Sequence, residues 1–187
     1  MTPAASPRRL FGWANLLTAL RAGLILPIVG CIVQRQWLAA AFLFVVAVAS
    51  DVADGRVARR LGEASALGGL FDHAVDALFV ASSIAALAWL GIATPWLPVL
   101  VLVAFVQYML DSRVLAGQTL RGNRLGRYNG VAYFVVVGIA VIGAALGLPA
   151  WLAVDLVTAL SWILVASTLV SMAIRAAAYL RARRRGD

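Results

Sequence analysis

The chain has 187 residues, of which 63% are hydrophobic and only 13% charged, and its mean hydropathy is +0.93. A soluble globular domain carries about 25% charged residues, so the composition excludes one and indicates a polytopic membrane protein. All sixteen basic residues are arginines, and the net charge is +8. Because these arginines flank apolar segments, we expect them to face anionic lipid headgroups and expect no nucleic-acid partner.

Six apolar segments follow one another along the chain, separated by short polar or Gly/Pro-containing breaks. A membrane-spanning helix needs about 20 residues, and the length has room for six such helices with short connections. We therefore predict an all-α, single-domain membrane protein over residues 1–187. The expected transmembrane helices are 10–33, 37–59, 67–91, 95–116, 127–147 and 150–178.

The arginines predict the orientation. With six spans, the clusters at 8–9, 56–60, 113–127 and 175–185 fall on one side of the membrane, and Arg35 lies on the other. The positive-inside rule makes the first side cytoplasmic, with both termini there. The predicted location is a bacterial inner membrane.

Polar residues mark one face of the first span near its cytoplasmic end. Asn15, Thr18 and Arg21 recur at i, i+3 and i+6, which is roughly one helical face. These side chains either hydrogen-bond to neighbouring helices or contact a ligand. The residues themselves leave both interpretations open.

Four aspartates lie inside strongly apolar sequence around the second and third spans. Asp51 and Asp54 share one face of the second helix, and Asp72 and Asp76 share one face of the third. If the two faces meet, four carboxylates converge on one site. An ionised carboxylate in hydrocarbon costs several kcal/mol, so such a site needs strong compensation.

Divalent cations are the compensation that this composition favours. Oxygen ligands with no cysteine nearby suit Mg²⁺, Mn²⁺ or Ca²⁺ better than zinc. An alternative is an ion-pair network of Asp51 and Asp54 with Arg56, Arg59 or Arg60. A function of another class, a cation transporter that uses the aspartates as an ion path, also stays open. His73 follows Asp72 and leaves the aspartate face, so we do not expect it to be a ligand.

The pattern D-x2-D-G-x2-A-R-x8-G-x3-D-x3-D resembles the signature of the CDP-alcohol phosphotransferases (CDP-alcohol phosphatidyltransferases), which are integral membrane enzymes of phospholipid synthesis. The segment 15–21, followed by Pro27, also resembles the first span of many members. Every signature position is filled, by Asp51, Asp54, Gly55, Ala58, Arg59, Gly68, Asp72 and Asp76.

The resemblance implies transfer of a phosphatidyl group from CDP-diacylglycerol to a small polar alcohol acceptor, with release of CMP. It implies that Asp51, Asp54, Asp72 and Asp76 hold Mg²⁺ or Mn²⁺, as two ions, and that Asp76 is the base that deprotonates the acceptor. It also implies a homodimer in contact with membrane lipid. Because the signature lies on the arginine-rich side of the predicted spans, we expect the active site to face the cytoplasm.

Small residues of the signature leave room for a nucleotide, although ordinary helix packing explains small residues as well. Arg59 is expected to contact a nucleotide phosphate. The predicted CDP-binding set comprises Asp54, Gly55, Ala58, Arg59, Gly68, Asn15, Thr18 and Arg21.

Arginines outside the signature lie on the same predicted side of the membrane. Guanidinium groups bind phosphate in bidentate fashion, so these residues suit an acceptor that carries a phosphate, although anchoring of the topology explains them too. The predicted acceptor-phosphate set is Arg113, Arg124, Arg127 and Arg175. The favoured acceptor is glycerol 3-phosphate, followed by inositol phosphate, phosphatidylglycerol and serine.

Overall fold

The computed structural model describes residues 13–61, 66–112 and 123–184, and for residues 13–17, 53–61, 66–67, 111–112, 150 and 182–184 it describes the backbone alone. The described residues form helices and turns with no strand, which confirms the all-α prediction for this part of the chain. The helices are α1 (Trp13–Val33), α2 (Trp37–Leu61), α3 (Ala66–Trp89), α4 (Trp96–Ser112), α5 (Arg124–Ala145) and α6 (Ala150–Arg184).

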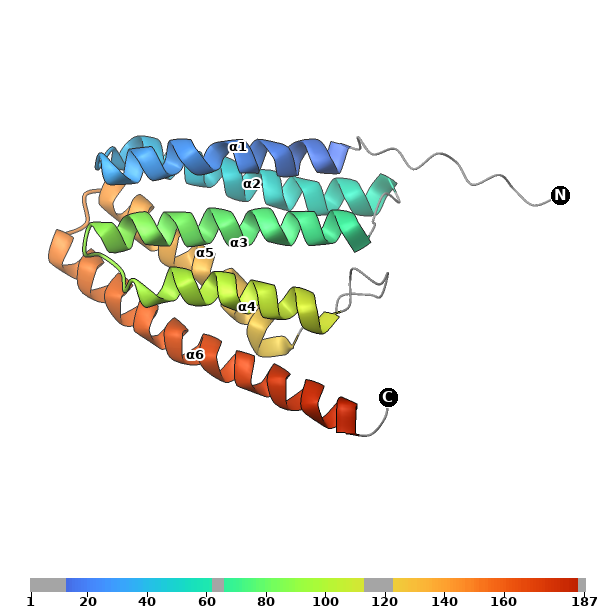
Figure 1. Cartoon of the computed structure of the whole chain (residues 1–187). Coiled ribbons are helices and arrows are strands. Elements are labelled where there is room, and N and C mark those ends of the chain that lie inside the picture. Colours follow the sequence, from blue (N-terminus) through green and yellow to red (C-terminus); the bar gives the residue numbers. More distant parts are fainter. Residues whose placement is uncertain (1–12, 62–65, 113–122, 185–187) are drawn as a thin grey trace.

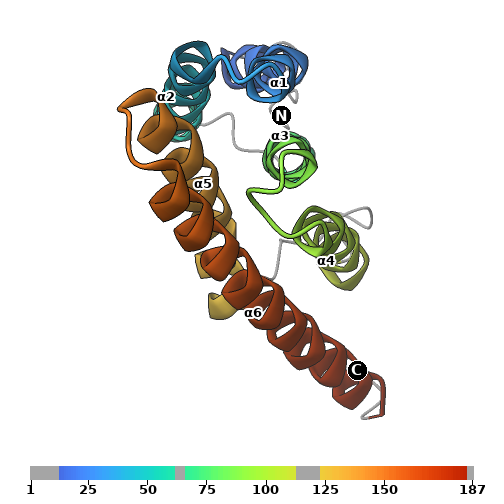
Figure 2. The same cartoon turned by 90° about the vertical axis from the view of Figure 1, so that its left-hand side faces the viewer.

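The helices run alternately up and down in one bundle (Figure 1). α1 packs on α2 and α3, and α2 also packs on α5. α3 packs on α4 and α5, and α6 packs on the same two helices. Figure 2 shows that α6 crosses the bundle obliquely, beside α5 and α4. Because the direction alternates, the end of α2, the start of α3, the end of α4 and the start of α5 meet at one end.

The opposite end of the bundle has three tight turns of the same kind. Arg35, Gly91 and Gly147 have φ values of 58°, 75° and 75°, in the left-handed region that ends many helices. The amide after each donates to a carbonyl five residues earlier, at 2.8, 2.9 and 3.0 Å. These bonds satisfy carbonyl groups at the helix ends and keep the connections short.

The bundle core is built from β-branched, leucine, phenylalanine and alanine side chains on α1 to α6. Phe79 is fully buried, and its ring stacks on Phe134 with centroids 6.1 Å apart. Phe44 of α2 packs on the same Phe134 ring at 6.5 Å. The core therefore ties α2, α3 and α5 together beneath the polar end of the bundle.

Within the described ranges, three helical segments are long and apolar enough to cross a membrane: Gly68–Trp89, Arg124–Ala145 and Trp151–Arg181. Shorter apolar stretches cover Thr18–Val33, Trp37–Val52 and Trp96–Leu110. The six predicted helices are all present, with shifted boundaries. α5 begins at Arg124 because Asn123 caps it, and α6 continues to Arg184 because its alanine- and arginine-rich end favours helix.

Candidate active site

Three carboxylates of the signature converge on one guanidinium group. Arg21 of α1 is fully buried, and its Nη2 lies 3.0 Å from Oδ1 of Asp51, which lies in the second half of α2. Its Nη1 lies 3.0 Å from Asp72 Oδ1 and also contacts Asp76, both on α3. Asp51 of α2 and Asp72 and Asp76 of α3 are thus brought together by a residue of α1.

The polar face of α1 completes this cluster. Thr18 is 2% exposed, and its hydroxyl donates to Asp72 Oδ1 at 3.5 Å. Thr18 and Arg21 are one turn apart, so both side chains reach the same carboxylate. Of the two interpretations left open for this face, contact with neighbouring helices is observed for Thr18 and Arg21.

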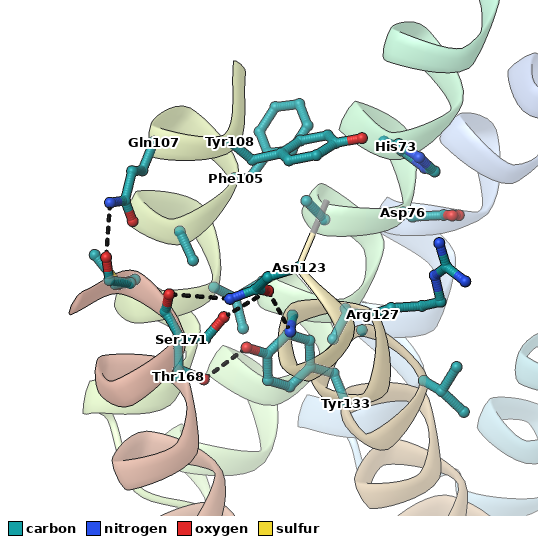
Figure 3. A pocket seen from close by; sticks show the side chains of 18 of the residues that line it. His73, Asp76, Phe105, Gln107, Tyr108, Asn123, Arg127, Tyr133, Thr168 and Ser171 are labelled. Atoms are coloured by element: carbon teal, nitrogen blue, oxygen red, sulfur yellow. Dashed lines mark hydrogen bonds between the residues drawn. The ribbon is translucent and has the colours of Figure 1, made fainter. Parts of the chain in front are cut away.

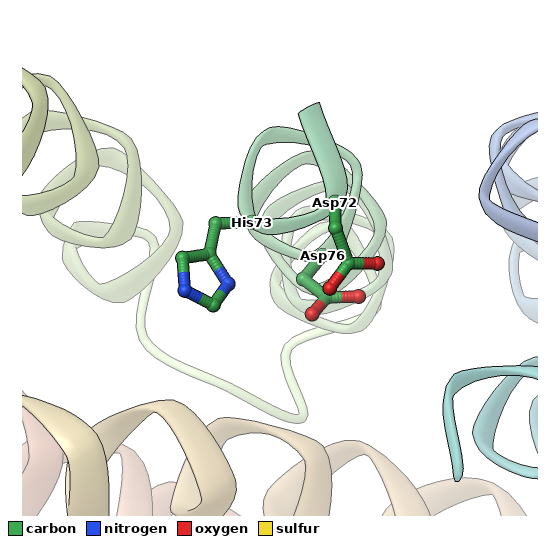
Figure 4. Close-up of side chains that lie close together, drawn as sticks. All are labelled: Asp72, His73 and Asp76. Atoms are coloured by element: carbon green, nitrogen blue, oxygen red, sulfur yellow. The ribbon is translucent and has the colours of Figure 1, made fainter. Parts of the chain in front are cut away.

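An aspartate–arginine network is thus present, but with an arginine that the sequence did not single out for it. The alternative paired Asp51 with Arg56, Arg59 or Arg60, whose side chains lie outside the described residues. The sequence prediction assigns Arg21 to nucleotide binding instead. Asp76 follows Asp72 by four positions, about one helical turn, and Figure 4 shows both leaving α3 on the same side.

The donor set at this point suits a hard divalent cation. One ligand atom each from Asp72, His73 and Asp76 lies within 4.8 Å of the others. Figure 4 shows that the His73 side chain leaves α3 in a different direction from the two aspartates, as expected from its position in the sequence. Its ring nevertheless comes close to them. Carboxylate oxygens that already surround one cationic group have the charge and spacing to hold Mg²⁺ or Mn²⁺.

A cavity of about 540 Å³ opens beside these carboxylates. Asp51 and Asp76 form part of its wall, and the rest comes from α3, α4, α5 and α6 (Figure 3). Its wall is apolar over much of its area, with Phe105, Val131 and Phe134 among the lining residues. A binding site of this size that is mostly apolar with a few polar groups is typical of a small-molecule site.

Two of the predicted acceptor-phosphate arginines line this cavity. Arg127 lies one turn into α5, and Figure 3 shows its side chain extending toward Asp76. Arg175 of α6 lies over the ring of Tyr108, 4.8 Å from the ring centroid. Arg124 is exposed at the start of α5 and is not part of the wall, and Arg113 lies outside the described residues.

A set of hydrogen bonds between α5 and α6 forms the cavity wall opposite α3. Asn123 caps α5 by accepting from Gly126 N at 2.7 Å, and its Nδ2 donates to the carbonyl oxygen of Ser171 at 3.2 Å. Deeper in the bundle, the Tyr133 and Thr168 hydroxyls share a hydrogen bond of 2.6 Å. These bonds fix the start of α5, where Arg127 lies, against α6.

Sequence reasoning missed this polar wall, although α6 carried a signal for it. Ser161, Thr168, Ser171 and Arg175 follow at i, i+7, i+10 and i+14, which is one face of an otherwise apolar helix. The first three of these side chains are buried. Buried polar groups on one helical face indicate an interior polar surface in a membrane bundle.

The remaining predicted residues are placed by the backbone only. Gly68 is partly buried on α3, two turns before Asp76 and on the same face. Asn15 lies on α1, and the residues of the signature from Asp54 to Arg59 lie on the last turns of α2. The structure does not describe the side chains of these residues. The nucleotide roles of Asn15, Asp54, Gly55, Ala58 and Arg59 therefore remain predictions.

Comparison with known proteins agrees with the signature. Putative cardiolipin synthases of Mycobacterium bovis and Mycobacterium tuberculosis are each 34% identical over 105 residues, which is 54% of this chain and 49% of theirs. A cardiolipin synthase (CMP-forming) of Streptomyces coelicolor is 42% identical over 53 residues, 28% of this chain and 25% of its own. The aligned region thus spans about half the length of the mycobacterial relatives, and no solved structure matches the chain.

The family itself is identified by a match over most of the chain. The sequence model of the CDP-alcohol phosphatidyltransferases matches residues 11–173, which include all of α1 to α5 and the part of α6 that carries Ser161, Thr168 and Ser171, whereas Arg175 lies just beyond the match. The same residues hold the carboxylate cluster and most of the cavity wall. The chain belongs to the CDP-alcohol phosphatidyltransferase family.

Proposed function

We propose that this protein transfers the phosphatidyl group of CDP-diacylglycerol to a polar alcohol that carries a glycerol phosphate group, and releases CMP. The observation that supports this most directly is the convergence of Asp51, Asp72 and Asp76 beside a cavity that also contains Arg127 and Arg175. Family membership supports the reaction type.

The reaction joins the acceptor oxygen to the phosphorus atom of the phosphatidyl group and breaks that atom's bond to the CMP oxygen. Asp76 lines the cavity, and in this proposal its carboxylate accepts the acceptor's hydroxyl proton as the new bond forms. Asp51, Asp72 and Asp76, together with Asp54, would hold Mg²⁺ or Mn²⁺, which neutralises charge on the diphosphate and on the leaving CMP.

The acceptor enters from the side of α4, α5 and α6 in this proposal. Arg127 and Arg175 supply positive charge to its phosphate, and guanidinium groups match phosphate oxygens in bidentate geometry. Glycerol 3-phosphate and phosphatidylglycerol both carry such a group. The names of the similar proteins favour phosphatidylglycerol, which gives cardiolipin, over the glycerol 3-phosphate that the arginines alone suggested.

The same proposal includes a membrane arrangement. All six helices cross the bilayer, the arginine-rich end of the bundle faces the cytoplasm, and two copies of the chain associate. The positive-inside rule supports the orientation, because the arginines of α5 and α6 named above lie at the end of the bundle that holds the aspartates.

The test is release of CMP by protein purified in detergent. CDP-diacylglycerol is supplied with Mg²⁺ or Mn²⁺ and, in separate reactions, glycerol 3-phosphate, phosphatidylglycerol, inositol phosphate or serine. We expect metal- and acceptor-dependent release that Asp76→Asn abolishes. Asp155→Asn is the matched control, because Asp155 is an exposed carboxylate at the start of α6, about 30 Å along the helix from Arg175. Folded protein that releases no CMP with any acceptor, or that moves cations instead, refutes the proposal.

A further inference from the structure

Tyr108 of α4 lies between the signature helix and the arginine of α6. Its ring centroid is 5.9 Å from that of His73 on α3, with the two planes tilted by 59°. On α6, the guanidinium carbon of Arg175 lies 4.8 Å from the same ring centroid. All three residues line the cavity. In Figure 3 the hydroxyl end of Tyr108 is on the side of His73.

Two contacts with the same residue orient the guanidinium of Arg175. The face of an aromatic ring attracts a cation, and more strongly where water is excluded. In addition, Arg175 Nη2 donates to the backbone carbonyl of Tyr108 at 3.4 Å. A planar guanidinium that stacks on a ring and bonds to a carbonyl beside it has lost much of its rotational freedom, so a ligand that binds it loses less entropy.

We propose that Tyr108 is a positioning residue of the acceptor site, whose ring holds Arg175 in the orientation that receives the acceptor's phosphate. The inference rests on the proposed function, since it takes Arg175 as a phosphate ligand. Tyr108 acts through Arg175 and has no part in the proton transfer assigned to Asp76. The phenol hydroxyl is not required for this role, because the attraction comes from the ring face.

α4 and α6 are also joined beside this ring by a contact that does not involve it. Gln107 Nε2 donates to the carbonyl oxygen of Met172 at 3.0 Å, which joins the two helices next to Tyr108. Loss of the ring therefore leaves a bond between the helices in place. This separates the effect on Arg175 from an effect on the fold.

The experiment compares wild type, Tyr108→Phe and Tyr108→Leu in the CMP-release assay. The acceptor, either glycerol 3-phosphate or phosphatidylglycerol in mixed micelles, is varied at saturating CDP-diacylglycerol, and then the reverse. For Tyr108→Leu we expect a rise of roughly 5- to 30-fold in the acceptor KM and an unchanged KM for CDP-diacylglycerol. Tyr108→Phe is expected to keep the acceptor KM of the wild type. In a double-mutant cycle, Tyr108→Leu adds little to the loss caused by Arg175→Gln.

An unchanged acceptor KM in Tyr108→Leu overturns the inference. So does Tyr108→Phe with the same defect as Tyr108→Leu, because the hydroxyl and not the ring face would then act. If Tyr108→Leu fails to fold, Tyr108→Met fills the space with a flexible apolar chain and takes its place. An active wild type with unaffected variants removes only this inference, whereas a wild type without CMP release removes the proposed function as well.

Discussion

Replacing Arg21 with glutamine removes the cation on which three carboxylates converge. Removal of one partner from a buried ion pair costs about 3–5 kcal/mol, because the other charge is left without compensation. The Asp51 side chain is 43% exposed, so water compensates it in part, whereas Asp72 and Asp76 are 28% and 22% exposed. We therefore expect a loss near the lower limit, about 3 kcal/mol, in Arg21→Gln.

The measurement is thermal unfolding in detergent, with and without divalent metal. In a chain of this size 1 kcal/mol shifts Tm by about 2–4 °C, so in EDTA we expect Arg21→Gln to unfold roughly 6–12 °C below wild type. With Mg²⁺ or Mn²⁺ at about 100 times Kd, binding to the folded state contributes about 2.7 kcal/mol, so Arg21→Gln with metal is expected to unfold close to the temperature of the wild type in EDTA. Arg35→Gln is the control, since this substitution makes the same chemical change in an exposed turn.

Two results refute this reasoning in different ways. If Arg21→Gln in EDTA unfolds at the temperature of Arg35→Gln, Arg21 does not compensate the aspartates. If Arg21→Gln is strongly destabilised but metal restores nothing, the compensation is confirmed and the carboxylates do not bind the metal.

Three further predictions concern glycines and metal. An added Cβ at Gly138 lies 3.0 Å from the Phe44 ring, between α5 and α2, so we expect Gly138→Ala to lower the free energy of unfolding by about 1–3 kcal/mol, measured by thermal unfolding. Gly23→Ala is the control: an added Cβ there has no atom within 4 Å, and we expect a neutral or slightly stabilising effect. At Gly126 the added Cβ lies 2.6 Å from Asn123 Oδ1; Gly126→Ala therefore breaks the cap of α5, costs about 1 kcal/mol and raises the acceptor KM, and an unchanged KM contradicts the role of this cap. Chelation of divalent metal is expected to stop CMP release by the wild type reversibly; activity that persists in EDTA contradicts the metal site.

The helices were predictable from the sequence because the apolar runs are long and their breaks are polar or contain glycine. The residues at which the helices begin and end were less predictable. α5 begins three residues before the predicted 127, since Asn123 binds both Gly126 N and Ser171, and the second contact comes from a residue far along the chain. No local pattern in the sequence contains that information.

The convergence of Asp51, Asp72 and Asp76 was predictable because the spacing of the aspartates matches the helix period and the two helices that carry them are consecutive in the sequence. The role of Arg21 was not. The sequence placed it beside a ligand, but only the packing of α1 on α3 shows that it contacts Asp72 and Asp76. In the same way, the stacking of Arg175 on Tyr108 depends on how α6 crosses α4, which hydropathy does not specify.

The contact of Arg21 with residues of the next two helices bears on how the chain is inserted during synthesis. α1 precedes α2 and α3 in the sequence and is synthesised before them, so in the proposed membrane arrangement its guanidinium is already available when the acidic helices follow it into the bilayer. The later helices then meet a charge partner at once, and α3 with its two aspartates need not wait for a metal ion to be accommodated in lipid. In the proposed membrane arrangement, the order of the helices along the chain thus supplies the cation before the carboxylates that need it.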